Sequence, residues 1–244
     1  MRAHTDERRV VTVVFADLVG YTALSESLDP EAVKRLVDRA FEKLVGDVSA
    51  FGGRVDKIVG DAIVALFGAP VAHEDDAERA VRAALRMQES LAGHAAEVGV
   101  DIRMRIGVNT GEVLVGALRS GGDYTAMGDV VNTASRLETS ANPGEVLVGP
   151  ATYQATRDVI GYESRGAMLV RGREAAVEVW AATAALVPPG YRPRRVTPLV
   201  GRDTELGILR NLVELGVGHS RGQLVLLLGE AGVGKTRLAN EIAP

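Results

Sequence analysis

The stretch Gly53–Phe67 constrains the fold of this chain more than any other. Two apolar runs rich in β-branched residues, Val55–Val59 and Ala62–Phe67, meet at Gly60 and Asp61. Two such runs joined by a glycine turn predict a β-hairpin. An aspartate at the tip of a hairpin is either a solvated turn residue or a ligand that presents its carboxylate to a cation. The hairpin alone leaves both interpretations open.

The patterns on either side of this hairpin predict an α+β domain. Arg9–Asp17 is a near-continuous apolar run, as expected for a strand buried on both faces. Asp29 and Pro30 cap a predicted helix that ends near Phe51. The further elements that we expect are a helix at 75–91, a hairpin of 102–108 and 113–115, a strand at 124–127, a helix at 129–140, a strand at 145–148, and a last helix and strand ending near 183. We expect one mostly antiparallel sheet with the helices on one face.

Composition excludes several classes of function. The net charge of −4 gives no electrostatic basis for binding nucleic acid or anionic membranes. The 244 residues contain no cysteine, which rules out disulfides and thiolate zinc sites. His73 and His94 lack a second ligand at metal spacing, so we expect both at the surface. No signal peptide or membrane-spanning run is evident, and we expect a soluble cytoplasmic protein.

Two aspartates, Asp17 and Asp61, lie where predicted strands end or turn. If the two strands are neighbours in the sheet, both carboxylates converge on one spot. Convergent carboxylates are how proteins hold the paired divalent ions used in phosphoryl chemistry, about 4 Å apart. We therefore expect a two-metal site at this edge of the sheet.

Asn132 and Arg136 lie four residues apart in the predicted helix at 129–140 and project from the same face. An amide beside a guanidinium suits an orienting hydrogen bond and a charge clamp on a phosphate. A solvated helix face is the alternative interpretation of this pair. Asp129 follows a glycine, as a metal-binding aspartate could, but we assign it to the helix N-cap.

Four segments of the chain resemble the class III nucleotide cyclases, the adenylyl and guanylyl cyclases. They follow the order and spacing of that family and together span about residues 7–183; the segments are Val14–Thr22, Val55–Gly68, Ile106–Gly111 and Tyr124–Glu138. The resemblance implies a ferredoxin-like catalytic domain over residues 1–185, with a linker at 186–196.

The resemblance also implies roles for individual residues. Asp17 and Asp61 would bind two Mg²⁺ or Mn²⁺ ions per site, with the backbone carbonyl of Leu18 as a further ligand. Lys57 and Thr125 would recognise the base.

The remaining roles implied by the resemblance concern the sugar and the phosphate. Asn132 would orient the ribose and Arg136 would stabilise the pentavalent phosphorus. The family's sites are shared across a homodimer, so the expected function is an adenylyl cyclase that converts ATP to cyclic AMP and pyrophosphate.

One position departs from the pattern of many adenylyl cyclases, which carry aspartate where this chain has Thr125. The threonine hydroxyl can still accept a hydrogen bond from the adenine amino group. Guanylyl cyclases usually have an acidic residue at the position of Lys57, so adenine is favoured. The alternative function is a catalytically weak, nucleotide-sensing dimerisation module that regulates a fused ATPase.

A second motif lies near the end of the sequence. Gly229–Thr236 matches the Walker A pattern, with Gly229, Gly234, Lys235 and Thr236 as its signature residues, and follows a predicted strand at 224–228. Residues 197–244 resemble the start of the ATPase module in bacterial cyclase-ATPase-regulator proteins. No Walker B carboxylate follows in this sequence, so we expect a truncated P-loop fragment without ATP hydrolysis.

Overall fold

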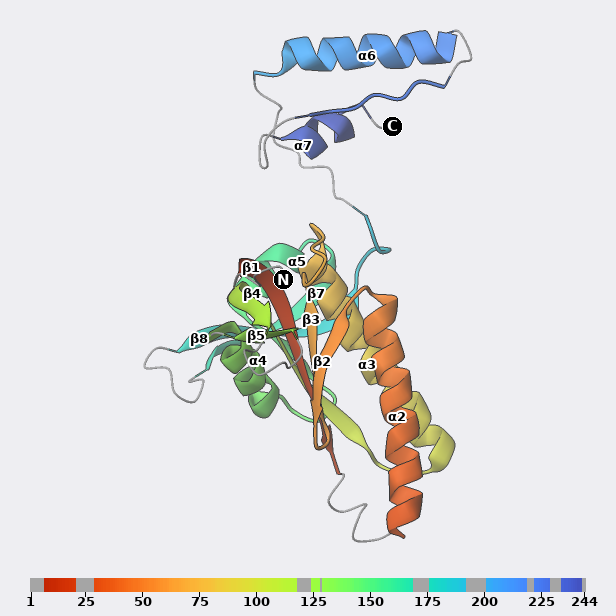
Figure 1. The fold of residues 1–244 in the computed structure, drawn as a ribbon, viewed down its shortest axis with the longest axis vertical. Coiled ribbons are helices and arrows are strands. Elements are labelled where there is room, and N and C mark those ends of the chain that lie inside the picture. The colour runs from red at the N-terminus through yellow and green to blue at the C-terminus, as the bar shows by residue number, and fades with distance from the viewer. Residues whose placement is uncertain are drawn as a thin grey trace. The chain divides into compact units, whose positions relative to one another are not determined.

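The chain forms two compact units in the computed structural model, Met1–Tyr191 and Arg192–Pro244 (Figure 1). The structure describes residues 7–20, 29–117, 124–127, 129–168, 176–191, 201–218, 222–228 and 234–242. Residues 192–196 of the expected linker lie outside these residues.

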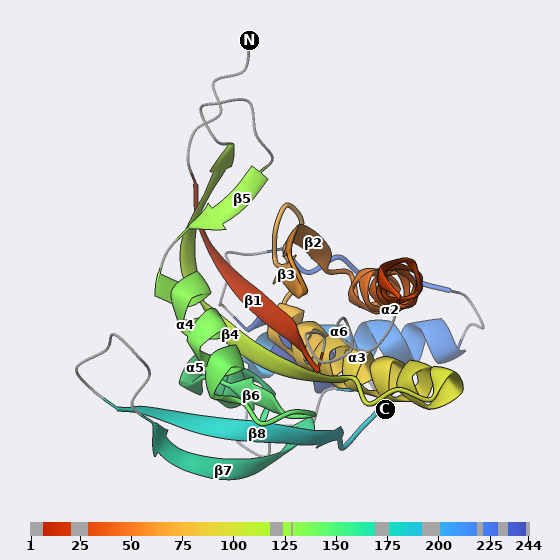
Figure 2. The ribbon, with the colours of Figure 1, turned by 90° about the horizontal axis from the view of Figure 1, so that it is seen from below.

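The first unit is built on one sheet (Figures 1 and 2). Its strands lie side by side in the order β2 (Arg54–Val59), β3 (Ala62–Phe67), β1 (Glu7–Val19), β4 (Arg103–Ala117), β6 (Val146–Val148), β8 (Val177–Ala185) and β7 (Ile160–Met168), and β5 (Tyr124–Met127) pairs with β4 outside this order. Among the described neighbours, β4 and β6 are parallel and the other pairs are antiparallel. This confirms the predicted α+β class with a mostly antiparallel central sheet.

Helices cover both faces of the sheet, and the prediction of helices on one face is wrong. On one face, α2 (Pro30–Ala50) and α3 (Asp76–Val98) pack over alternate residues of β1, among them Val14 and Ala16. On the other face, α4 (Asp129–Ser140) covers Val11 and Val13 of the same strand. Figure 2 shows α4 on the opposite side of β1 from α2 and α3. The apolar run of β1 requires this cover, since a strand that is apolar on both faces must be buried on both.

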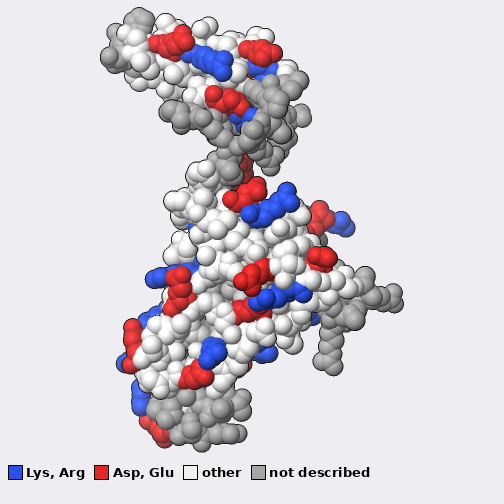
Figure 3. Space-filling model, turned by 180° about the vertical axis from the view of Figure 1, so that it is seen from behind, with Lys and Arg blue, Asp and Glu red and all other residues white. Residues whose placement is uncertain are grey.

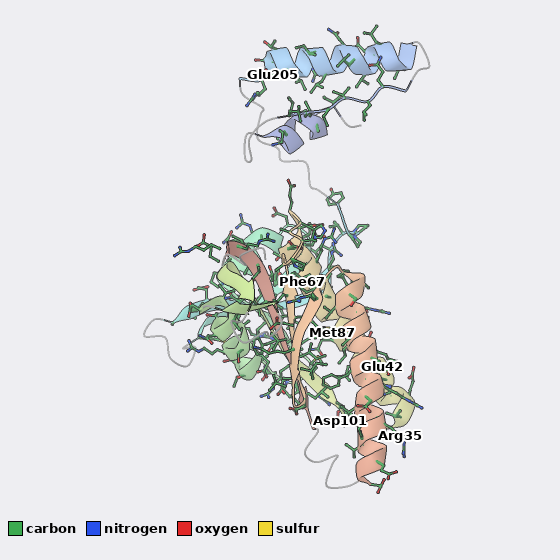
Figure 4. All side chains as sticks on the ribbon, viewed as in Figure 1. Arg35, Glu42, Phe67, Met87, Asp101 and Glu205 are labelled. Carbon is green, nitrogen blue, oxygen red and sulfur yellow. The ribbon has the colours of Figure 1, made fainter. Side chains whose placement is uncertain are left out.

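The core between the sheet and α3 is closed by large apolar side chains. Phe67 of β3 and Met87 of α3 are both fully buried and are labelled in Figure 4. Arg35 and Glu42 project from the exposed side of α2 (Figure 4). On the face shown in Figure 3, acidic and basic side chains of the described residues lie interspersed.

The predicted second hairpin at 102–115 is wrong, because β4 is a single strand. It pairs with the whole of β1, from Glu7 opposite Val115 to Val19 opposite Arg103. The sequence Asn109-Thr-Gly111 has the composition of a turn, but its glycine is needed for the packing of α4 instead. A Cβ on Gly111 would overlap the side chain of Val130 in α4, so this glycine admits the helix rather than turning the strand.

Several boundaries also differ from the predicted ones. Helix α3 continues to Val98 and ends at Gly99 in the left-handed conformation, seven residues beyond the expected end at 91. This extension buries His94, which is 3 % exposed and lies 3.3 Å from the carbonyl oxygen of Leu36. The prediction that His94 lies at the surface is therefore wrong. His73 is exposed, as expected.

The C-terminal part of the first unit contains one strand more than the sequence indicated. A short helix, α5 (Pro150–Thr156), is followed by two antiparallel strands, β7 and β8. Tyr153 of α5 stacks on Trp180 of β8 with ring centroids 4.1 Å apart. This contact anchors α5 over the sheet.

The second unit contains two helices in its described residues, α6 (Asp203–Gly218) and α7 (Lys235–Asn240). The predicted strand at 224–228 is wrong for the described structure, because residues 222–228 form no strand there. A β-strand needs a neighbour for its backbone hydrogen bonds, so this segment leaves Leu224 and Leu228 almost fully exposed.

Candidate active site

The predicted hairpin is confirmed and carries Asp61 to the end of β1. The strands β2 and β3 meet at Gly60, whose φ of +64° explains the glycine. Asp17 pairs with Ala62, and the amide of Leu18 donates to the carbonyl oxygen of Asp61 at 3.3 Å. The two aspartates expected to bind metal therefore lie close together, Asp17 near the end of β1 and Asp61 in the turn before β3.

An arginine from β4, the other neighbour of β1, lies beside Asp17. Arg105 of β4 pairs with Asp17 across the sheet. Its Nη2 donates to Oδ2 of Asp17 at 2.7 Å. Both side chains are largely buried, at 21 % exposure for Asp17 and 30 % for Arg105, so this ion pair is shielded from much of the screening that weakens surface pairs.

A third carboxylate, Glu138 of α4, contacts the same guanidinium. Its Oε1 lies 3.3 Å from Nε of Arg105, and its side chain is 10 % exposed. Burial raises the pKa of Glu138, and the charge of Asp17 raises it further, while Arg105 lowers it. Asp61 also raises this pKa, so its charge reaches Glu138. Two carboxylates thus contact one guanidinium, which leaves a net negative charge that suits a bound cation.

The donor set fits a hard divalent ion completed by substrate. In the described part of the chain, no three His, Cys, Asp or Glu side chains form a group that could hold a metal. The side chain of Leu18 has no donor atom, so only its backbone carbonyl could contribute. Magnesium is commonly held by one or two carboxylates together with water and substrate phosphates, and Asp17 with Asp61 is such a set.

Lys57 lies on β2, the edge strand of the sheet, and its side chain is half exposed at 50 %. A register shift between Val55 and Lys57 makes Asp56 an extra residue in the strand. Such a bulge turns neighbouring side chains in unusual directions. Here it leaves the carboxylate of Asp56 buried, 4.0 Å from Nζ of Lys57 and 3.4 Å from Nη2 of Arg54.

The remaining predicted residues lie on α4 and β5. Asn132 is exposed and Arg136 half-buried, whereas Ala134 and Leu137 are fully buried. Asn132 and Arg136 therefore occupy the face of α4 turned away from the sheet. The backbone of Thr125 pairs with Gly116 at the far end of β4, and the side chain of Thr125 lies outside what the structure describes.

Sequence reasoning missed Arg105 and Glu138. One signal was present: Arg105 interrupts an otherwise apolar run between Met104 and Val108. Glu138 ends a segment that was singled out for Asn132 and Arg136, but nothing local connects it with Arg105. Only the packing of α4 on β4 brings the two together.

In the second unit, the described part of the Walker A segment begins at Gly234. This glycine has a φ of +88° and directly precedes α7, whose first residue is Lys235. Gly229 and the side chain of Thr236 lie outside the described residues. A glycine followed by a helix that begins with lysine is the arrangement that a phosphate-binding loop needs at its end.

The fold is that of a nucleotide cyclase catalytic domain. The chain belongs to the family described as the adenylate and guanylate cyclase catalytic domain, whose family model matches residues 4–183, and thus to the class III cyclases. The model of the AAA ATPase domain matches residues 198–244. Cyclases of this class use divalent metal ions.

Named relatives include both kinds of cyclase. Adenylate cyclase 1 of Rhizobium meliloti is 33 % identical over 181 residues, which are 71 % of this chain but 27 % of that protein. The chain thus spans about a quarter of the length of this relative. The adenylyl cyclase CyaB from P. aeruginosa has a TM-score of 0.71 and is 31 % identical over 74 % of this chain and 97 % of that one. The guanylyl cyclase Cya2 has a TM-score of 0.69 and is 32 % identical over 76 % of this chain and 97 % of that one.

Within the described residues, no helix combines the length and apolarity needed to cross a bilayer.

Proposed function

We propose that the chain is an adenylyl cyclase that converts ATP to cyclic AMP and pyrophosphate at two identical sites of a homodimer. The convergence of Asp17 and Asp61 from neighbouring strands carries this proposal. Both carboxylates have room for ligands from solvent, since both residues are partly exposed. The location that goes with this substrate, and that we propose, is the cytoplasm.

Asp17 and Asp61 would hold two Mg²⁺ or Mn²⁺ ions, and the carbonyl of Leu18 would be a further ligand. When bound, such ions favour deprotonation of the ribose 3′-hydroxyl and neutralise charge on the triphosphate. The protein's own contribution is to fix the two carboxylates on adjacent backbones. The attacking 3′-oxygen can then be held in line with the bond between the α-phosphorus and the leaving pyrophosphate. Asn132 orients the ribose, and Arg136 stabilises charge on the phosphorus in the transition state.

Adenine is the base that we propose for this site. The ammonium group of Lys57 donates to a ring nitrogen of the base, and the hydroxyl of Thr125 accepts from the amino group. A site built on hydrogen bonds rejects a base that leaves these groups unpaired. Relatives of both specificities match this chain at similar identity, so the chemistry of these two residues, rather than the overall likeness, supports adenine.

The distance between Asp17 and Thr125 in one chain supports a site shared by two chains. Asp17 pairs with Arg105, and Thr125 pairs with Gly116, so the two lie at opposite ends of β4. At about 3.3 Å per residue, this part of β4 is on the order of 35 Å long. This length exceeds that of an extended nucleoside triphosphate. A base read by Thr125 therefore belongs to a nucleotide whose phosphates lie at Asp17 of a second chain.

The outward face of α4 agrees with this arrangement. Asn132 and Arg136 point away from the sheet of their own chain, which carries Asp17 and Asp61. A two-fold dimer uses the same surface of both chains, so each chain would supply metal ligands to one site and α4 side chains to the other.

The test is a turnover assay on the purified full chain with Mn²⁺ and either ATP or GTP, with products separated by chromatography. We expect cyclic AMP and pyrophosphate from ATP at a rate well above that from GTP, and no product after chelation of the metal. Asp61→Asn, which keeps the shape of the side chain and removes its charge, should lower turnover by at least about a hundredfold. Nucleotide binding without any turnover would support the sensing module instead and overturn the proposal.

A further inference from the structure

Arg105 bridges two carboxylates that belong to different elements. Its Nη2 donates to Oδ2 of Asp17 at 2.7 Å, and its Nε lies 3.3 Å from Oε1 of Glu138. An arginine fork can engage two acceptors from fixed positions, which a lysine ammonium cannot do in the same geometry. The guanidinium is thus hydrogen-bonded to Asp17, the carboxylate that we propose as a metal ligand.

A divalent ion and this guanidinium compete for Asp17. The ion needs lone pairs of the carboxylate, and the donated hydrogen bond already uses Oδ2. Two cations at one carboxylate also repel each other, and the repulsion is larger at a partly buried site than in water. The guanidinium therefore weakens binding of the ion at Asp17 for as long as it stays on this carboxylate.

Glu138 can retain the guanidinium through a hydrogen bond when a divalent ion takes Asp17. Its Oε1 is buried and accepts no hydrogen bond in the described part of the protein, and Nε of Arg105 likewise donates none. A buried acceptor and a buried donor 3.3 Å apart need only a small rotation to form a hydrogen bond.

The backbone that carries Glu138 has little freedom to withdraw. A Cβ on Gly107 would overlap the backbone of Ala134 and Glu138, which shows how closely α4 lies on β4. Arg105 is two residues before Gly107 in the same strand and points to the same face. The close approach at Gly107 therefore holds Glu138 beside Arg105.

We propose that Arg105 is an internal counter-ion that occupies Asp17 in the metal-free protein, and that Glu138 is the positioning residue that retains Arg105 when a divalent ion takes Asp17. This rests on the proposed function, which makes Asp17 a metal ligand. Its consequence is that the protein binds divalent ions weakly in the absence of nucleotide. Removing the guanidinium should strengthen that binding.

The test measures Mn²⁺ binding to the nucleotide-free full chain, from the electron paramagnetic resonance signal of the free ion. Arg105→Gln should tighten binding by about fivefold, the scale expected of a partly exposed charge pair. Arg103→Gln is the matched control, because it removes the same charge two residues away on the same strand. Arg103 pairs with Asp101 at 3.0 Å and is largely exposed, so its loss should change binding by less than about twofold.

Glu138→Gln should weaken Mn²⁺ binding by about threefold, because Arg105 then keeps Asp17 as its main acceptor. A general loss of negative charge would have the same sign, and the double variant Arg105→Gln/Glu138→Gln separates the two causes. If Glu138 acts through Arg105, its substitution has little effect once Arg105 is gone; if it acts through its field alone, the two effects add.

The outcomes are distinct. Tighter binding in Arg105→Gln but not in Arg103→Gln, with non-additive double substitution, supports the proposal. Unchanged or weaker binding in Arg105→Gln, equal effects of the two arginine variants, or additive effects with Glu138→Gln overturn it. Should Arg105→Gln unfold, Arg105→Met gives the same test, since it also removes the guanidinium and its charge. Parental binding that survives Asp17→Ala would overturn the metal assignment itself, and with it this proposal.

Discussion

Gly107 of β4 lies directly beneath the backbone of Glu138 in α4, so closely that one added methyl group would overlap the amide nitrogen of Glu138. The helix that carries Asn132 and Arg136 on its outer face is thus positioned by the absence of a side chain on the strand beneath it. This contact links the packing of the sheet to the geometry of the proposed site.

Gly107→Ala should therefore impair activity strongly, although it adds only one methyl group. The methyl group meets backbone atoms, which cannot rotate away, so α4 must shift and carry its side chains with it. Overpacking of this kind costs about 1–3 kcal/mol of stability. We expect turnover at least about tenfold lower at a temperature where circular dichroism shows the protein folded.

Gly46→Ala is the control for this substitution. Gly46 lies inside α2, and a Cβ there would meet nothing within 4 Å. Alanine in an unobstructed helix interior is more stable than glycine by about 0.5–1 kcal/mol. Gly46→Ala should raise the melting temperature and leave turnover unchanged; a loss of activity in both variants would mean that the effect is not specific to the packing of α4.

Complementation between inactive chains tests the shared site. Asp61→Asn and Arg136→Ala should each be inactive as homodimers. In a freely exchanging equal mixture about half of the dimers are mixed, and each has one intact site of two, so about a quarter of the parental activity should return.

The control mixture is Asp17→Ala with Asp61→Asn, whose defects lie in the same half of the site. Every site then carries one defect, and no activity should return. Activity in this control, or none in the first mixture despite chain exchange shown by mass-tagged protomers, would contradict a site shared in this way.

The identity of the base depends on Lys57 and Thr125. Lys57→Glu combined with Thr125→Cys should reverse the hydrogen-bonding preference of the site, so that the ratio of ATP to GTP turnover falls by at least about tenfold. The measurement is the ratio of kcat/KM for the two nucleotides with Mn²⁺. A ratio that stays at the parental value would show that other residues choose the base.

The buried hydroxyl of Tyr162 should make the first unit less stable at alkaline pH. Burial raises its pKa to about 12, and its hydroxyl is hydrogen-bonded to Oγ1 of Thr156 at 2.5 Å. The folded protein keeps this proton while the unfolded chain loses it near the ordinary value of 10.0. Because the folded state binds more protons, stability is complete below pH 10 and falls as the pH rises toward about 12.

Tyr162→Phe should remove part of this slope. The variant loses a hydrogen bond and therefore about 1 kcal/mol at neutral pH, but its melting temperature should fall less steeply between pH 10 and pH 11. The control is Tyr191→Phe, which alters a half-exposed tyrosine and should keep the parental slope. Equal slopes in Tyr162→Phe and the parent would contradict the assigned pKa.

The elements that the sequence alone predicted are those that local interactions decide. The hairpin at Gly60 follows from a glycine between two β-branched runs, and α2 follows from Asp29, whose carboxylate accepts from the amide of Glu31. Asp17 and Asp61 could be named as a pair because each marks a strand end or turn. These signals lie within a few residues of the feature that they specify.

Tertiary structure decided what depends on contacts between distant segments. Asn109-Thr-Gly111 has the composition of a turn, yet it continues β4, because its glycine and Gly107 face the helix α4 rather than a bend in the chain. The pairing of Arg105 with Glu138 joins a strand to a helix whose close approach depends on Gly107 and Gly111. No local pattern encodes such a contact, because its energy arises only when the helix packs on the sheet and both charges leave water together.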